Sequence, residues 1–193
     1  MKLVFATSNI NKAAEIARLL PDSIEILTLK DLKVTEEIPE TADTLEGNAH
    51  LKASYITEKF GIPCFADDTG LEIASLDNRP GVHSARYAGE HRSDEDNMKK
   101  VLEELKNYPD RSARFRTVIA LHLPKISLDF EGIINGEILS EKQGTDGFGY
   151  DPIFAPEGYD KSFAEISMDE KNAISHRGRA VQKLVAFLNE YTH

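Results

Sequence analysis

The sequence predicts an α/β fold in which a central mixed sheet is flanked by helices. Short apolar runs typical of buried strands alternate along the chain with stretches whose apolar residues recur at helical spacing. The chain also opens with a strand, a loop, a helix and a strand, an order typical of α/β proteins. Its 193 residues, with no recognisable linker, favour a single domain over 1–193 that has room for two lobes.

The first three elements are two strands and the helix between them. The apolar runs at residues 3–6 and 24–29 predict strands, the first of them buried. Between the two runs, apolar side chains at helical spacing predict a helix that begins near Asn11 or Lys12. Pro21 closes this helix, because proline cannot continue the hydrogen-bonded backbone.

A second amphipathic helix is predicted over residues 45–60. Asp43 or Thr44 can serve as its N-cap, and Glu46 is placed to form a capping box with Asp43.

The rest of the chain alternates strands, helices and glycine-rich loops. The predicted elements are a short strand at 64–66, apolar chain again at 71–73, a long loop at 76–92, a helix starting at Ser93, strands at 115–123 and within 127–139, and a last helix over about 177–191. Long irregular loops inside compact domains are often functional, so the loop at 76–92 is of interest.

Composition narrows the possible partners and the compartment. The formal net charge is −10, from 23 Lys and Arg against 33 Asp and Glu, and a long nucleic acid needs a basic surface, so no nucleic-acid partner is predicted. Cys64 is the only cysteine and can form no internal disulfide. The N-terminal apolar run is too short for a signal-peptide core. No stretch approaches the roughly 18 apolar residues of a membrane span. These observations predict a cytoplasmic protein with no membrane partner.

The segment TSNINK, residues 7–12, lies where the first strand feeds the first helix. Free backbone N–H groups and the helix dipole favour an anion at such a position, and Lys12 adds positive charge. The alternative is an ordinary helix cap. The segment lacks the G-x-x-x-x-G-K-[ST] pattern, so a Walker-type P-loop is not predicted.

The stretch FADDTG, residues 65–70, places two carboxylates side by side. Asp67 and Asp68 are a solvated turn in one interpretation and part of a Mg²⁺ site in the other, because Mg²⁺ takes one or two carboxylates together with phosphate oxygens. If the chain is extended here, the two side chains point to opposite faces and only one faces a given site. Glu40 is a candidate second ligand.

Two later segments carry further candidate groups. In GTDGFGYDP, residues 144–152, three glycines surround the aromatic residues Phe148 and Tyr150, which predicts either a base-stacking platform or a tight structural turn. In EKNAISHRG, residues 170–178, Lys171, His176 and Arg177 gather just ahead of the last helix, where they can donate to an anion or a carbonyl.

Together the four segments resemble the inosine triphosphate pyrophosphatase family, also called XTP/dITP diphosphatases. The segments are ATSNINK, FADDTGLEI followed by PGVHSARYAG, GFGYDPIF and EKNAISHRG, in the order and rough spacing of that family. The resemblance runs from about residue 3 to residue 188. It departs from the usual pattern at Ser8, where a glycine is common, and at Thr69, where a serine is common.

The resemblance implies an elongated, two-lobed α/β homodimer with its active site in the cleft. It implies hydrolysis of deaminated purine nucleoside triphosphates (dITP, ITP and XTP) to the monophosphate and pyrophosphate, with Mg²⁺ as the cofactor. In this reaction water attacks the α-phosphate, and its biological role is to cleanse the nucleotide pool.

The resemblance also assigns the site residues. Asp68 is implied as the general base and, with Glu40, as a Mg²⁺ ligand, whereas Asp67 either binds the metal through water or holds the turn. Arg177 is the candidate donor to the purine 6-oxygen. The implied substrate contacts are Thr7, Ser8, Asn9, Ile10, Asn11, Lys12, Thr69, Phe148, Gly149, Tyr150, Asp151, Lys171, His176 and Arg177.

Two other functions share parts of this pattern. A Maf-type pyrophosphatase would share a phosphate loop and an acidic metal site, but it should lack the GFGYDP and SHRG segments. A nucleotide-binding sensor would keep Phe148 and Arg177 but would need no carboxylate base, so the presence of Glu40 and Asp68 argues against it.

Overall fold

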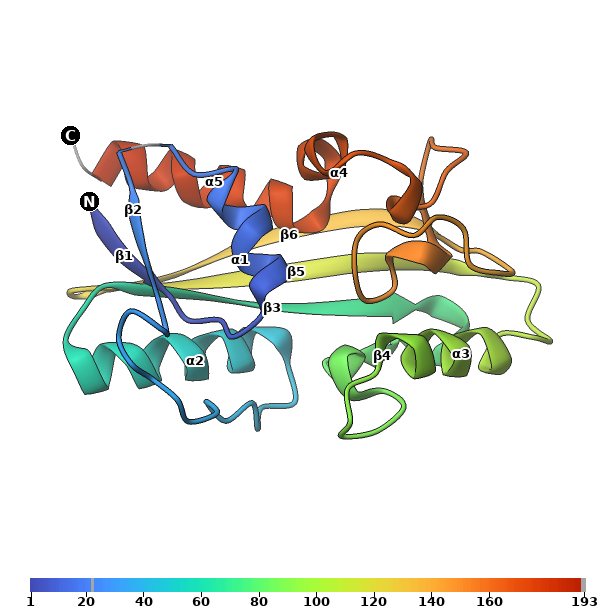
Figure 1. Ribbon diagram of the computed structural model, residues 1–193, viewed down its shortest axis with the longest axis horizontal. Coiled ribbons are helices and arrows are strands. Elements are labelled where there is room, and N and C mark those ends of the chain that lie inside the picture. Colours follow the sequence, from blue (N-terminus) through green and yellow to red (C-terminus); the bar gives the residue numbers. More distant parts are fainter. Residues whose placement is uncertain (22, 192–193) are drawn as a thin grey trace. The chain divides into compact units, whose positions relative to one another are not determined.

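A single mixed sheet runs through the protein (Figure 1), whose computed structural model describes residues 1–21 and 23–191. The strand order is β2-β1-β3-β5-β6-β7, and β4 pairs with β3. β1 is parallel to β2 and β3, whereas β4 is antiparallel to β3 and β7 to β6, so the predicted mixed sheet is confirmed. The strands are β1 (Lys2–Phe5), β2 (Glu25–Thr28), β3 (Cys64–Ile73), β4 (Arg79–Gly81), β5 (Ser112–Leu123), β6 (Ile126–Ile138) and β7 (Phe154–Pro156).

Five α-helices accompany the sheet in the described part of the chain. They are α1 (Ile10–Ala17), α2 (Leu45–Phe60), α3 (Asp94–Glu104), α4 (Met168–Ile174) and α5 (His176–Tyr191). Short 3₁₀ turns lie at Ala74–Leu76, Ser84–Arg86, Asp151–Ile153 and Phe163–Glu165. Within residues 1–21 and 23–191, none of the helices has both the length and the apolar composition of a membrane span.

The chain divides into two compact units. The first comprises Met1–Asp68, Thr117–Gly132 and Arg177–His193, and the second comprises Thr69–Arg116 and Ile133–His176. β3, β5 and β6 therefore contribute residues to both units. The elongated outline, the single domain with two lobes and the cleft site stay predictions.

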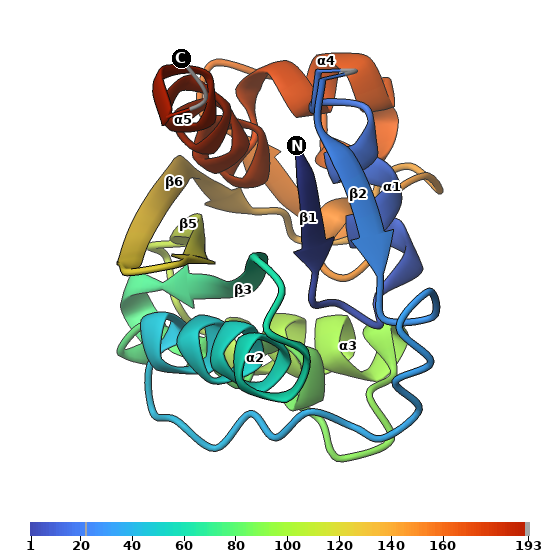
Figure 2. The same cartoon turned by 90° about the vertical axis from the view of Figure 1, so that its left-hand side faces the viewer.

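In the first unit, both faces of the sheet are covered. Leu3 and Phe5 of β1 belong to one apolar cluster with residues of α1 and α5, whereas Val4 and Ala6 belong to another with residues of α2. The alternation follows from the two-residue period of a strand. Figure 2 shows α5 and α2 on opposite sides of the strands of this unit. The rings of Phe5 and Phe65 stack with their centroids 4.7 Å apart.

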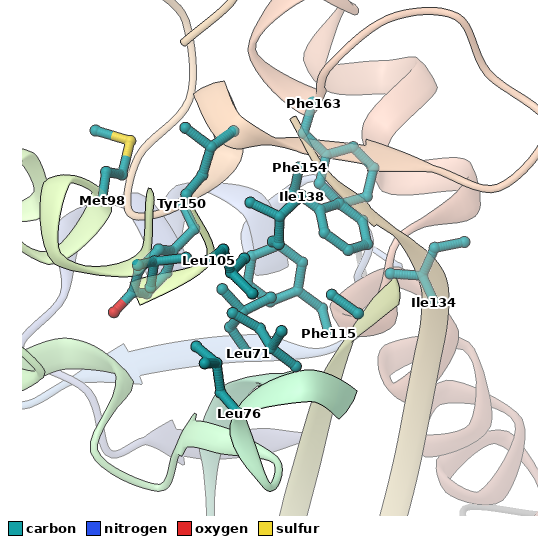
Figure 3. Packing of buried hydrophobic residues seen from close by; sticks show 14 of the residues in the cluster. Leu71, Leu76, Met98, Leu105, Phe115, Ile134, Ile138, Tyr150, Phe154 and Phe163 are labelled. Carbon is teal, nitrogen blue, oxygen red and sulfur yellow. The ribbon is translucent and has the colours of Figure 1, made fainter. Parts of the chain in front are cut away.

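In the second unit, the core contains a group of aromatic rings among aliphatic side chains (Figure 3). The Phe115 ring lies 4.7 Å from the Phe154 ring in an edge arrangement and 6.1 Å from the Phe163 ring, between centroids. Met98 of α3 and Leu71 of β3 pack into the same cluster. Thus β3, which begins in the core of the first unit, ends in the core of the second.

The acidic pair lies inside a strand and not in a turn. Where the sequence predicted a short strand at 64–66 and apolar chain again at 71–73, β3 runs without interruption from Cys64 to Ile73. Asp67 and Asp68 are 1% and 9% exposed, so the solvated-turn interpretation is wrong. A strand can contain two buried carboxylates only when cations or donors compensate them, and the residues that do so define the candidate site.

Several helix ends differ from their predictions. α1 begins at Ile10 with Asn9 as its N-cap, and it ends at Ala17, before Pro21. α2 is capped by Thr44, one of the two candidates, which places Gly47 and not Glu46 at the third helical position; the predicted capping box with Asp43 is wrong. α4, a short helix capped by Ser167, was not predicted. Ser93 caps α3 as predicted.

Candidate active site

Asp67 is held by two cations in the first unit. Its Oδ2 lies 3.0 Å from Lys12 Nζ and 3.3 Å from Arg177 Nε. Burial alone would raise the pKa of Asp67, yet Lys12, Arg177 and Lys52 hold it well below the usual range. The printed contacts of Asp67 are with cations of the protein, which is what a residue that holds the chain requires, and its role toward a metal stays a prediction.

Arg177 completes this arrangement by pairing with Glu15. Arg177 is 2% exposed, and its guanidinium donates to the carboxylates of Glu15 and Asp67. Burial lowers the pKa of Arg177, but the two carboxylates outweigh burial and raise it. We refer to Lys12, Glu15, Asp67 and Arg177 as the buried ion-pair cluster. A contact between Arg177 and a purine would require the guanidinium to share or leave these partners, so its specificity role stays a proposal.

Asp68 faces a different set of groups. Its Oδ2 accepts from Asn48 Nδ2 at 3.2 Å, and its Oδ1 lies 3.6 Å from Lys52 Nζ. Lys52 Nζ also donates to Glu40 Oε1 at 2.6 Å. Asn48 and Lys52 stand four residues apart on one face of α2, so this helix presents both partners to Asp68. The expectation that adjacent Asp67 and Asp68 serve different sites agrees with these contacts.

The two carboxylates differ in electrostatic character. Burial raises the pKa of Asp68, Glu40 and Asp67 add to the effect, and Lys52 and Lys12 oppose it without cancelling it. A carboxylate that binds protons more tightly than usual is a stronger base. Burial lowers the pKa of Lys52, but the three neighbouring carboxylates outweigh burial and raise it, so the ammonium remains charged.

The pair Glu40 and Asp68 fits a hard divalent cation. Oxygens of both carboxylates already converge on one ammonium, that of Lys52, which shows that this position accommodates positive charge. Within residues 1–21 and 23–191, no group of three or more His, Cys, Asp or Glu side chains converges. Two protein carboxylates are the usual number for Mg²⁺, which completes its coordination with water and substrate phosphate oxygens.

Residues 7–12 form the N-terminal end of α1. Asn9 Oδ1 accepts from the backbone N–H groups of Asn11 at 3.0 Å and Lys12 at 3.1 Å, and Thr7 Oγ1 accepts from Asn9 N at 3.1 Å. For Asn9, the helix-cap interpretation is thus correct. Ser8 is exposed and Ile10 is 83% exposed. An anion at this end would meet the Ser8 hydroxyl and the Lys12 ammonium and not the two N–H groups that Asn9 caps.

The second unit contains the glycine-rich segment, which we call the base-stacking loop and define as residues 144–151. Asp151 Oδ2 accepts from Phe148 N at 2.9 Å and from Lys171 Nζ at 2.6 Å. The Lys171 ammonium lies 4.9 Å from the centroid of the Phe148 ring. Gly147 has φ +77°, and a Cβ there would lie 2.2 Å from Asp151 Oδ2, so only glycine allows this close turn.

The remaining predicted contacts divide into accessible and enclosed groups. Phe148 and Gly149 are partly exposed, as is Thr69, which follows Asp68 in β3. Tyr150 is 4% exposed and its hydroxyl donates to Ser84 O at 2.7 Å (Figure 3 shows its ring in the core). His176 is 3% exposed and stacks on Phe115 at 4.6 Å. The structure thus places Tyr150 and His176 mainly as packing residues, and their substrate contacts stay predictions.

Sequence reasoning missed Asn48, Lys52 and Glu15. Each lies within a helix, where a polar residue usually belongs to a solvated face. The sequence contains one indication of two of these residues: Asn48 and Lys52 are polar, lie four residues apart and interrupt an otherwise apolar stripe of the helix. In the structure, Asn48 Oδ1 also accepts from Ala42 N at 2.9 Å, next to the segment that carries Glu40. Their burial, 1% for Asn48 and 8% for Lys52, could not be read from the sequence.

Fold and site together define a class: a mixed α/β protein in which two carboxylates, one from the central strand, meet on a cation. Comparison then gives the family. Residues 3–187 match the Ham1 family, and the chain belongs to this family. The Maf-type alternative is thereby set aside.

Individual relatives are similar over nearly the whole chain. A protein of Flavobacterium johnsoniae named dITP/XTP pyrophosphatase is 58% identical over 188 residues, which are 97% of this chain and 98% of that protein. The Staphylococcus aureus Ham1 protein superposes with a TM-score of 0.90 at 39% identity, over 99% of this chain and 100% of that one. A HAM1 protein from Coxiella burnetii gives 0.91 at 42% identity, over 98% and 99%.

Proposed function

We propose that the protein is a nucleoside-triphosphate pyrophosphatase that converts dITP, ITP and XTP to the monophosphate and pyrophosphate. The observation that carries the proposal is the convergence of Glu40 and Asp68 on one cationic position, in a chain closely similar to proteins named dITP/XTP pyrophosphatase. Family membership supports hydrolysis of nucleoside triphosphates, and the contacts of the site residues support the roles of general base, metal ligand and substrate contact.

Asp68 is the general base. It accepts a proton from water, whose oxygen forms a bond to the α-phosphorus while the bond from that phosphorus to the bridging oxygen of the β-phosphate breaks. Pyrophosphate leaves with the electron pair. The raised pKa of Asp68 suits proton transfer, and Asn48 orients the carboxylate through its Oδ2.

Glu40 and Asp68 would hold Mg²⁺. When bound, Mg²⁺ supplies charge neutralisation for the triphosphate and the leaving pyrophosphate. Lys52 keeps the two carboxylates together, at 2.6 Å from Glu40 and 3.6 Å from Asp68. If these carboxylates held Mg²⁺, the Lys52 ammonium would be available to donate to a phosphate oxygen.

Lys12 and Ser8 contact the phosphate tail. Lys12 is anchored by Asp67, and burial lowers the pKa of its ammonium, which Asp67 opposes. A lysine fixed in this way presents a positioned charge to the phosphates at less entropic cost than a free surface lysine. Thr7, Asn9, Ile10 and Asn11 complete this segment, and Thr69 contributes a hydroxyl beside Asp68.

Phe148 stacks on the purine, and the neighbouring cation recognises its 6-oxygen. Lys171 lies over the Phe148 ring and, like Arg177, is buried against a carboxylate, because its Nζ donates to Asp151 Oδ2 at 2.6 Å. Within the second unit its ammonium can donate to a 6-oxo group while it shares this bond with Asp151. Adenine presents an amino donor at this position, and a donor facing a donor leaves both groups unpaired. A site built on such a hydrogen bond discriminates by about 10⁴ to 10⁵. Arg177 joins this recognition only if it leaves Glu15 or Asp67.

Product analysis tests the proposal. With saturating Mg²⁺, the protein should release pyrophosphate and IMP from ITP, and kcat/KM should exceed that for ATP and for pyrimidine triphosphates. Turnover should stop when Mg²⁺ is chelated. Stepwise release of orthophosphate would contradict the mechanism, equal kcat/KM for ITP and ATP would contradict the specificity, and binding without turnover would identify a sensor.

We further propose that the protein works in the cytoplasm as a homodimer and removes deaminated nucleotides from the precursor pool. The compartment is supported by the cysteine count, because Cys64 is the only cysteine and can form no disulfide within the chain. The dimer and the cleansing role rest on the resemblance alone. Light scattering of the purified protein would test the dimer.

A further inference from the structure

The base-stacking loop has unusual conformational freedom and must be fixed from outside. Gly144, Gly147 and Gly149 all have positive φ, at +80°, +77° and +62°. Glycine in this region loses more conformational entropy on ordering than any other residue. The orientation of Phe148 between these glycines therefore depends on the contacts that other elements make with the loop.

Three consecutive residues of the loop are held by hydrogen bonds, one within the loop and two to other elements of the second unit. Phe148 N donates to Asp151 Oδ2 at 2.9 Å, Gly149 N donates to Asp94 Oδ2 at 2.7 Å, and the Tyr150 hydroxyl donates to Ser84 O at 2.7 Å. The contact with Asp94 spans 55 residues of sequence and joins the loop to the first residue of α3.

α3 is a rigid support for this contact. Met98 and Val101 are buried in the aromatic core, and Asn97 accepts from Ala88 N at 2.7 Å and donates to Ala85 O at 3.1 Å. The N-cap function belongs to Ser93, which accepts from Asp96 N, so the Asp94 carboxylate is not needed for capping. Its neighbour Glu95 pairs with Lys142, just before the loop.

We propose that Asp94 is a positioning residue for substrate binding: its carboxylate fixes the peptide of Gly149 and thereby the plane of the Phe148 ring. The inference rests on the proposed function, in which Phe148 stacks on the purine. Asp94 touches no reacting atom. Its loss therefore reduces affinity for the base and leaves the chemical step unchanged.

The test compares Asp94→Ala with two matched variants. Asp94→Asn keeps an acceptor oxygen, and Glu95→Ala removes the same charge from the same helical turn without touching Gly149. In Asp94→Ala we expect the KM for ITP to rise about three- to tenfold, the factor for one net hydrogen bond, with kcat unchanged. Asp94→Asn and Glu95→Ala should stay close to wild type. An equal rise in Glu95→Ala, which also removes the Glu95–Lys142 pair, would overturn the proposal, because an effect of the helical turn that does not involve the Gly149 contact would then explain it.

A double-mutant cycle separates positioning from general destabilisation. In a Phe148→Ala background, Asp94→Ala should raise KM no further, because the group that it positions is gone. Additive effects would overturn the proposal. Hydrogen exchange of a peptide covering 144–151 gives an independent readout, with exchange expected to rise about three- to tenfold in Asp94→Ala only.

The outcomes distinguish this inference from the proposed function. If the wild type fails to release pyrophosphate from ITP, the proposed function is wrong, and the exchange measurement alone decides whether Asp94 fixes the loop. If the wild type is active and Asp94→Ala changes neither KM nor exchange, the inference is wrong and the proposed function stands.

Discussion

The two compact units hold their candidate site residues by different means. In the first, side-chain contacts between opposite charges hold the members of the buried ion-pair cluster, and a contact of the same kind pairs Asp68 with Lys52. In the second, one ion pair, Lys171 with Asp151, lies against the Phe148 and Phe163 rings, and the base-stacking loop is otherwise held through backbone groups. The first unit fixes the position of charges, whereas the second fixes the position of an aromatic plane.

This difference corresponds to two tasks in the proposed reaction. Phosphoryl chemistry needs charges at fixed positions, because electrostatic stabilisation falls off when the groups must reorganise. Recognition of the base needs an aromatic ring in a fixed plane and one hydrogen-bond donor. The chain crosses between the units four times, and two of these crossings, between Asp68 and Thr69 and between His176 and Arg177, lie within predicted site motifs.

The largest effect is expected for Asp68→Asn. The amide is nearly isosteric with the carboxylate but accepts no proton, so kcat for ITP should fall by about 10² to 10⁴. Because burial raises the pKa of Asp68, its charge costs folding free energy, and the amide should leave the metal-free protein as stable as before or more so. Steady-state kinetics and urea unfolding would measure both. Recovery of wild-type turnover at high Mg²⁺ would show that Asp68 is only a ligand.

Asp67→Asn should differ from Asp68→Asn by lowering the free energy of unfolding. It removes the anion between Lys12 and Arg177, and breaking a buried ion pair typically costs about 3 to 5 kcal/mol of unfolding free energy. Since the pKa of Asp67 is depressed, its contribution is present at neutral pH and is lost as pH falls below about 4, the unfolded value. The stability difference from wild type should therefore shrink in acid. A difference that is independent of pH would exclude charge as its cause.

The contrast between Asp67 and Asp68 marks the limit of sequence reasoning. The alternation of a strand predicts that neighbours face different ways, but not which one meets a base and which a structural cation. That assignment depends on Arg177, which lies 110 residues after Asp67 in the sequence and donates to it. It also depends on Glu15, which is the second carboxylate partner of Arg177. The fold class could be predicted because periodicity is local, whereas burial of Glu15, Asn48 and Lys52 depends on tertiary packing. Likewise the interruption expected after Ala66 was wrong because compensating charges keep the acidic pair in the strand.

A smaller effect separates the two lysines. Lys12→Met should raise KM for every triphosphate by a similar factor, because the phosphate tail is common to all of them. Lys171→Met should lower the preference for ITP over ATP by about 10- to 150-fold, the factor for one hydrogen bond to a charged group, and discrimination beyond this factor then belongs to the other polar groups of the site. Both substitutions keep most of the aliphatic stem. If Lys12→Met changed the ITP to ATP ratio and Lys171→Met did not, the division of tasks between the units would be wrong.

The smallest effects are expected at two helix caps, and they test whether the units unfold together. Thr44 Oγ1 accepts from Gly47 N at 3.0 Å in the first unit, and Ser93 Oγ accepts from Asp96 N at 3.2 Å in the second. Thr44→Ala and Ser93→Ala should each lower the free energy of unfolding by about 1 kcal/mol. Because β3, β5 and β6 belong to both units, we expect one cooperative transition, and labelling of buried Cys64 should accelerate about fivefold in both variants. Faster labelling in Thr44→Ala alone would show that the first unit unfolds independently of the second. The charge contacts of the first unit and the backbone contacts of the second would then belong to two separately stable parts.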